Sequence, residues 1–205
     1  MAITLTTQLL TFQEYLTQLA DTDIRSELAG GKLAPLAPPT GRHTAIARHL
    51  FRLLDRELTE RQQPWVVTYG DVGVRTGPHK VRLPDLTVIT AEQAAALWHT
   101  AAVLESPPLL AIEIISAEDP NRDYRYKRTE YAALEIPEYW VLDPHLEKIT
   151  VLTLVDGDYE SQEFTGDAAP VSPLFTHWTL PTASLLLSGA APATPQILPA
   201  PATPL

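Results

Sequence analysis

The sequence predicts an α/β fold, and two observations carry this prediction. Apolar residues recur at helical spacing over about 43–61, whereas 83–90 and 109–116 are short, apolar and rich in β-branched residues, as interior strands are. A length of 205 residues indicates one domain. We expect this domain to span 1–188, followed by a flexible tail at 189–205, because the tail has five prolines and no charged residue.

The first predicted elements are a short helix, a hairpin and a long helix. Residues 11–20 carry apolar side chains at helical spacing, and the glycines and prolines of 21–40 indicate a strand or hairpin. The long helix from His43 to about Arg61 combines an apolar stripe with a row of arginines on another face. The stripe is Ile46, Leu50, Leu53, Leu54 and Leu58, and the row is Arg48, Arg52 and Arg56. We favour a solvated face for this row over a nucleic-acid contact.

Strands predominate in the rest of the chain, where short runs of β-branched and aromatic residues follow Pro64. The predicted strands are 65–69, 72–76, 83–90, 109–116, 137–144, 147–155 and 158–164, and the predicted helices between them are 91–100 and 121–135. A turn at Asp156 and Gly157 joins the last two strands.

Composition excludes several kinds of site. The chain has no cysteine, so any metal would need Asp, Glu or His ligands. No apolar run approaches the roughly 18 residues of a membrane-spanning helix, and the N-terminus does not resemble a signal peptide. We therefore expect a cytoplasmic protein with no membrane partner. The net charge of -10 counts against nucleic-acid binding, although local charge near a site matters more than the total.

Two carboxylates stand out in the predicted interior strands. Glu113 interrupts the apolar run LLAIEII, and a buried ionised carboxylate is costly unless it is paired or bound to a metal. A strand-end glutamate paired with an arginine is the alternative. Asp85 follows Pro84 at the entrance of the neighbouring strand, where it could be a second ligand or could hydrogen-bond nearby backbone.

Lys127 lies on the apolar stripe of the last predicted helix. At about 100° per residue, Tyr124, Lys127 and Tyr131 share one face. The ammonium group could reach across the sheet to Glu113, extend to solvent, or pair with Asp123 four residues earlier.

Two carboxylates and a lysine suit phosphodiester hydrolysis. Mg²⁺, or Mn²⁺ in its place, is typically held by one or two carboxylates with waters and phosphate oxygens, so Asp85 and Glu113 suffice to bind it. Such an ion polarises the phosphoryl group and lowers the pKa of a bound water. Lys127 could orient the attacking water or offset charge that develops on the phosphate.

The segments that carry these residues resemble the Uma2 (DUF820) family over about residues 10–187. The matching segments are PD at 84–85, EIIS at 113–116, D-x-x-x-K at 123–127, YAALEIPEYWVLDP at 131–144 and SELAGGKL at 26–33. The resemblance implies the restriction-endonuclease-like fold of the PD-(D/E)XK superfamily, in which helices flank a central mixed β-sheet. It also implies a metal-dependent endonuclease acting on DNA.

By this resemblance Glu27 is a third acidic member of the site, and His43 supports it. A solvated strand residue and a surface histidine at a helix start are the respective alternatives. In the superfamily motif the lysine lies two residues after the acid, where this chain has Ile115. The resemblance therefore assigns that role to Lys127 on the following helix. Glu135 stands where related sequences usually carry glycine, at a helix C-terminus.

Nucleic-acid contacts are predicted for NRDYRYKR at 121–128, beside the site. Arg122, Arg125 and Arg128 are its candidate phosphate contacts, and tyrosines are interleaved with them. A solvated helix face is at least an equal alternative. Cleavage of both strands of a duplex would suggest a homodimer.

Two other functions stay open from sequence alone. The chain could be a catalytically inactive descendant of the nuclease fold that serves as a binding or regulatory module, which the acidic net charge favours. It could also be a metal-independent hydrolase with paired carboxylates, although Lys127 then has no role. Convergence of Glu27, Asp85, Glu113 and Lys127 in one cleft is the feature that discriminates.

Overall fold

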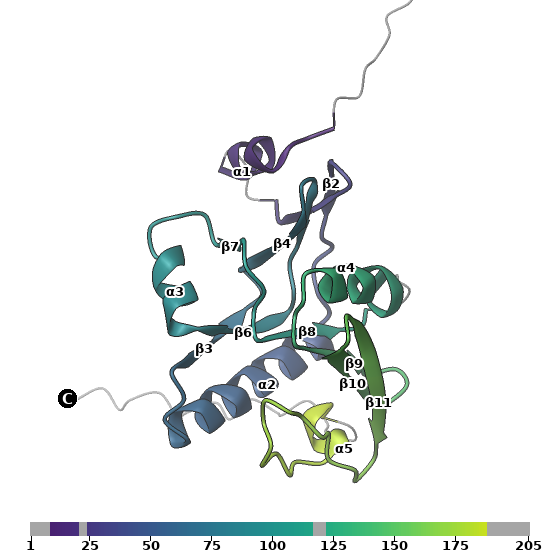
Figure 1. Cartoon of the computed structure of the whole chain (residues 1–205). Helices are drawn as coiled ribbons and strands as arrows, with labels where there is room; N and C mark the ends of the chain where they lie inside the picture. The colour runs from purple at the N-terminus through teal and green to yellow at the C-terminus, as the bar shows by residue number, and fades with distance from the viewer. Residues whose placement is uncertain (1–8, 21–23, 117–121, 188–205) are drawn as a thin grey trace, which may run out of the picture.

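The computed structural model describes residues 9–20, 24–116 and 122–187, and contains two mixed β-sheets flanked by helices (Figure 1). The tail predicted at 189–205 lies outside the described residues. Helices are α1 (Phe12–Ala20), α2 (Gly41–Glu60), α3 (Ala91–Leu97), the π-helical turn η1 (Arg122–Lys127), α4 (Arg128–Ala133) and α5 (Thr182–Leu185). None of the helices in these ranges is both long and apolar enough to cross a membrane.

The larger sheet has six strands in the order β11-β10-β9-β8-β6-β3. They are β3 (Trp65–Tyr69), β6 (Leu86–Thr90), β8 (Leu110–Ile114), β9 (Glu138–Asp143), β10 (Lys148–Val155) and β11 (Asp158–Thr165). Strands β8 and β9 are parallel and the other neighbours are antiparallel, so the sheet is mixed. The prediction that 83–90 and 109–116 are interior strands is confirmed, because β6 and β8 occupy inner positions.

The smaller sheet has five strands in the order β2-β1-β5-β4-β7. They are β1 (Ser26–Ala29), β2 (Lys32–Pro35), β4 (Gly73–Gly77), β5 (Lys80–Arg82) and β7 (Val103–Leu104). The hairpin predicted within 21–40 is formed by β1 and β2. Strands β5 and β7 were not predicted, because three and two residues are too few to show an alternating pattern.

The six-stranded sheet separates two apolar cores, because successive residues of a strand point to opposite faces. Leu110, Ile112 and Ile114 of β8 pack with α2 and α5 in one core. Ala111 and Ile115 pack with residues of α4 and of the smaller sheet in the other. Figure 1 shows α2 along one face of the sheet and α4 at the other. Glu113, which alternates with the first set, therefore faces α4.

Helix α2 begins and ends close to its predicted limits. The side chain of Thr40 accepts a hydrogen bond from the backbone N–H of His43 at 3.2 Å, which caps the first turn. The predicted single helix at 121–135 is instead the π-helical turn η1 followed by α4, so the assumption of 100° per residue is wrong over 122–127.

Candidate active site

Asp85, which directly precedes β6, and Glu113, on the neighbouring strand β8, lie at the same end of the larger sheet. The last pair of the β6–β8 ladder joins Leu86 to Ile112, and one further step of this register sets Asp85 opposite Glu113. The backbone N–H of Ile114 donates to Asp85 Oδ2 at 2.7 Å. This contact to the neighbouring strand agrees with the backbone role considered for Asp85 and also turns its carboxylate toward β8.

Lys127 reaches across the sheet to Glu113, as one of its three predicted orientations required. Its Nζ lies 2.7 Å from Glu113 Oε2 and 3.6 Å from Glu27 Oε1. Its side chain is 3% exposed, so it does not extend to solvent. The side chain of Asp123 lies outside the described residues. Lys127 is therefore a buried cation between two buried carboxylates.

The other oxygen of Glu113 is held by a tyrosine. The hydroxyl of Tyr131 on α4 donates to Glu113 Oε1 at 2.8 Å. Burial, with the charge of Glu113 beside it, raises the pKa of Tyr131 well above its ordinary value, so the hydroxyl keeps its proton. Among the described side chains, Glu113 therefore contacts a lysine and a tyrosine.

Glu27, on β1 of the smaller sheet, is fully buried, so the interpretation as a solvated strand residue is wrong. Its Oε2 accepts a hydrogen bond from Arg82 Nη1 at 2.9 Å, and its Oε1 accepts one from the backbone N–H of Leu83 at 3.2 Å. Together with the contact to Lys127, these bonds connect the smaller sheet to the carboxylates of the larger one.

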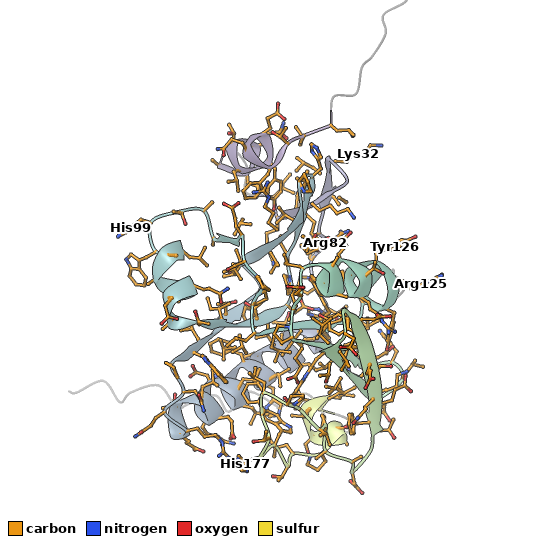
Figure 2. The ribbon with its side chains drawn as sticks, viewed as in Figure 1. Lys32, Arg82, His99, Arg125, Tyr126 and His177 are labelled. Carbon is orange, nitrogen blue, oxygen red and sulfur yellow. The ribbon has the colours of Figure 1, made fainter. Side chains whose placement is uncertain are left out.

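Arg82 and Glu130 form a partly buried ion pair that the sequence did not predict. Arg82 Nε and Nη2 donate to Glu130 Oε2 and Oε1 at 2.7 and 2.8 Å, while Nη1 contacts Glu27. Burial lowers the pKa of Arg82, but the hydrogen bonds and charges of Glu130 and Glu27 outweigh it and raise the pKa above its ordinary value. Burial raises the pKa of Glu130, but its bonds to Arg82, Lys80 and Thr76 lower it overall. Figure 2 shows Arg82 beside α4.

His43 lies next to Asp85 and is not the surface histidine of the alternative interpretation. Its Nε2 is 3.2 Å from Asp85 Oδ2, and its side chain is 16% exposed. Helix α2 begins two residues earlier, so the first turn of this helix positions the ring. Asp85 Oδ2 consequently has a histidine on one side and the backbone of β8 on the other.

A cavity of about 310 Å³ brings together four of the predicted residues, His43, Asp85, Glu113 and Lys127. Its lining also includes Arg25, Arg42, Leu83, Ile114, Ile115, Ser116, Pro144 and His145, together with the loop residues 36–40. Glu27 lies behind Lys127 and does not line the cavity. The sequence did not predict three lining residues, Arg25, Arg42 and His145. Only the fold brings together the residue before β1, the start of α2 and the turn after β9.

Among the described side chains of the basic segment at 121–128, Lys127 is the one that lines the cavity. Arg125 and Tyr126 point outward from the helix, and 64% of Tyr126 is exposed (Figure 2). Arg128 Nη2 donates to the backbone oxygen of Tyr159 at 2.6 Å. The side chain of Arg122 lies outside the described residues.

The donor set of the cavity suits a hard divalent cation. Asp85 and Glu113 supply carboxylate oxygens, and each oxygen has two lone pairs, so the bonds from Ile114, Lys127 and Tyr131 do not exhaust them. Within the described ranges no group of three or more His, Asp and Glu residues is placed to hold a metal. Two carboxylates completed by water and substrate oxygens are what Mg²⁺ ordinarily uses.

This chain is similar to known proteins in sequence and in fold. The Uma2 family model, described as "Putative restriction endonuclease", matches residues 12–183. The chain belongs to the Uma2 family. An "uncharacterized protein" of Synechocystis sp. is 26% identical over 176 residues, which are 80% of this chain and 98% of that relative. The family description indicates a restriction-endonuclease-like nuclease.

A solved structure has the same fold. The crystal structure of a "putative nuclease belonging to DUF820" from Anabaena variabilis superposes with a TM-score of 0.72 at 20% sequence identity. The match covers 87% of this Uma2 chain and 98% of that chain. The predicted fold class and the family resemblance are therefore confirmed.

Proposed function

We propose that this Uma2 protein is a metal-dependent endonuclease that hydrolyses phosphodiester bonds in DNA. The observation that carries the proposal is the convergence of Asp85, Glu113 and Lys127 on one cavity, with Glu27 directly behind Lys127. Two carboxylates beside a buried ammonium group match the charges of an anionic substrate and a divalent cation.

Asp85 and Glu113 are the residues that would hold Mg²⁺ or Mn²⁺. When bound there, the ion would polarise a phosphoryl oxygen and lower the pKa of a bound water. Lys127 lies beside this ion site, because its Nζ is 2.7 Å from Glu113 Oε2. Its positive charge would offset negative charge on the phosphate. Glu27 and Tyr131 orient Lys127 and Glu113, and His43 orients Asp85.

Cleavage of supercoiled plasmid by the purified full chain tests the proposal. We expect nicking with Mg²⁺ or Mn²⁺ and none with EDTA. Asp85→Asn, Glu113→Gln and Lys127→Met should each reduce the rate by at least about 100-fold. Glu160→Gln is the matched control, because Glu160 is an exposed carboxylate on β11 and should leave the rate unchanged.

Three outcomes would overturn the proposal. Cleavage that survives EDTA would indicate a metal-independent hydrolase with paired carboxylates. Cleavage that is unchanged in Asp85→Asn and Glu113→Gln would mean that the assigned site is wrong. If neither Mg²⁺ nor Mn²⁺ supports cleavage, the second candidate is favoured, an inactive binding or regulatory module. The engagement of both Glu113 oxygens by Lys127 and Tyr131 favours that candidate.

A further inference from the structure

The cavity has a local charge that differs from that of the whole chain. The chain carries a net charge of -10. Among the described residues, by contrast, the cavity lining has two arginines, Arg25 and Arg42, one lysine, Lys127, two carboxylates and two histidines. Affinity for a polyanion depends on such local groups, because each neutralised phosphate releases condensed counterions. The basic lining therefore favours a phosphate-rich ligand that extends beyond the two carboxylates.

Arg42 is the cavity-lining arginine with the greatest freedom to bind an external anion. It is exposed and lies in the first turn of α2, two residues after Thr40, the last of the lining residues 36–40. Within the described part of the chain its guanidinium makes no hydrogen bond and no ion pair. Arg25 differs, because its guanidinium donates to the backbone oxygen of Gly70 and lies 3.6 Å from Asp71. A planar guanidinium can donate two parallel hydrogen bonds to one phosphate.

His145 reaches the same cavity from a turn that is rigidly held. Asp143 Oδ1 accepts hydrogen bonds from the backbone N–H groups of His145 and Leu146, both at 2.9 Å. Asp143 Oδ2 accepts a third bond from the hydroxyl of Tyr124, at 3.1 Å. These bonds fix the turn after β9, and the exposed His145 ring stands at the cavity as a second donor.

We propose that Arg42 and His145 form a subsite that binds the DNA backbone phosphates next to the phosphodiester held at Asp85 and Glu113. The subsite rests on the proposed function and adds a way in which the substrate is bound. Contacts to phosphate carry no sequence information, so binding through this subsite depends on salt and not on base sequence. Arg125 and Tyr126, which point outward, have no part in it.

Fluorescence anisotropy with a labelled 20-base-pair duplex tests the subsite. The full chain is titrated in Ca²⁺ buffer at several NaCl concentrations, and the same is done with single variants. We expect Arg42→Gln to weaken binding about tenfold, and to reduce the slope of log K against log salt by about 0.9. His145→Gln should weaken binding by a smaller factor.

Arg48→Gln is the matched control. Arg48 is exposed on the same helix and does not line the cavity, so this variant removes the same charge from another face of α2. It should leave both affinity and slope unchanged. Equal losses in Arg42→Gln and Arg48→Gln would overturn the subsite, because they would indicate diffuse attraction. Absence of DNA binding by the unmodified chain would overturn it as well.

Hydrolysis of bis(p-nitrophenyl) phosphate separates failure of the subsite from failure of the proposed function. This small phosphodiester has no flanking phosphates, so Arg42→Gln should slow its hydrolysis by a smaller factor than it weakens DNA binding, whereas Arg48→Gln should leave the rate unchanged. If the chain hydrolyses it but Arg42→Gln binds DNA normally, the subsite is wrong and the nuclease assignment stands. If neither form hydrolyses any phosphodiester but Arg42→Gln loses DNA binding, the subsite stands and the activity is wrong.

Discussion

Replacement of Arg82 by methionine should destabilise the protein strongly, because Arg82 joins the buried carboxylate of Glu27 to the partly buried carboxylate of Glu130 on another part of the fold. Its side chain is 8% exposed, and it donates three charge-assisted hydrogen bonds, one to Glu27 and two to Glu130. Removal of one partner from a buried ion pair costs about 3–5 kcal/mol, because the remaining charge is left uncompensated. For a chain of this size the melting temperature should fall by about 6–20 °C.

The free energy of unfolding, measured by urea denaturation at pH 7, checks this magnitude. Arg56→Met is the matched control. Arg56 lies 3.8 Å from Glu60 on the surface of α2, with both side chains more than 60% exposed. That variant should lose less than about 0.5 kcal/mol. The double variant Arg82→Met/Glu130→Gln should recover part of the loss, because it removes one of the two carboxylates that lose Arg82 as a partner.

The loss should also depend on pH in a defined direction. The pKa of Glu130 is lowered below 4.5 in the folded protein, so its ion pair stabilises the fold above pH 4.5. This contribution disappears as the pH falls through the lowered pKa. The difference between the unmodified chain and Arg82→Met should therefore be largest at neutral pH and shrink below pH 4.5. If Arg82→Met loses no more free energy of unfolding than Arg56→Met at pH 7, the ion pairs of Arg82 do not stabilise the fold.

Three further substitutions test separate contacts. Tyr131→Phe removes the hydrogen bond to Glu113, and should lower the free energy of unfolding by about 1.5–3 kcal/mol in urea denaturation; no change would mean that the bond is dispensable. Burial raises the pKa of Glu138, so stability from its protonated form is present below pH 4.5 and is lost as the pH rises through the raised value. In Glu138→Gln the free energy of unfolding should therefore fall less as the pH rises above 4.5. An unchanged pH profile would contradict this role of Glu138. Glu135→Gly should raise the melting temperature and add about 0.5–1 kcal/mol, since Glu135 has a φ of 60°, which favours glycine; a lower melting temperature would contradict this.

Residues whose surroundings are local in sequence could be predicted. Glu113 was recognised because it stands in an apolar strand, and its burial at 3% exposure follows from that pattern. Glu135 was recognised as a helix C-terminal position, and its left-handed backbone agrees. The side of the helix that carries Lys127 was predicted correctly even though the turn before α4 is π-helical.

Residues whose role depends on long-range contacts could not be predicted. Arg82 lies in a strand of three residues, and its partner Glu130 is 48 residues away in sequence. Arg42 and His145 belong to a helix start and a turn that only the folded sheet brings to one cavity. Glu27 was identified through the family resemblance, because its strand has no pattern that distinguishes a buried glutamate from a solvated one.

The proposed activity requires that Asp85 and Glu113 hold a divalent metal beside Lys127. Anomalous diffraction from crystals soaked in Mn²⁺ tests it most directly, since manganese can be located without reference to activity. We predict one strong anomalous peak within about 2.5 Å of oxygens from both carboxylates, and its loss in crystals of Asp85→Asn. Full occupancy at another site, or a peak that persists in Asp85→Asn, would contradict the account.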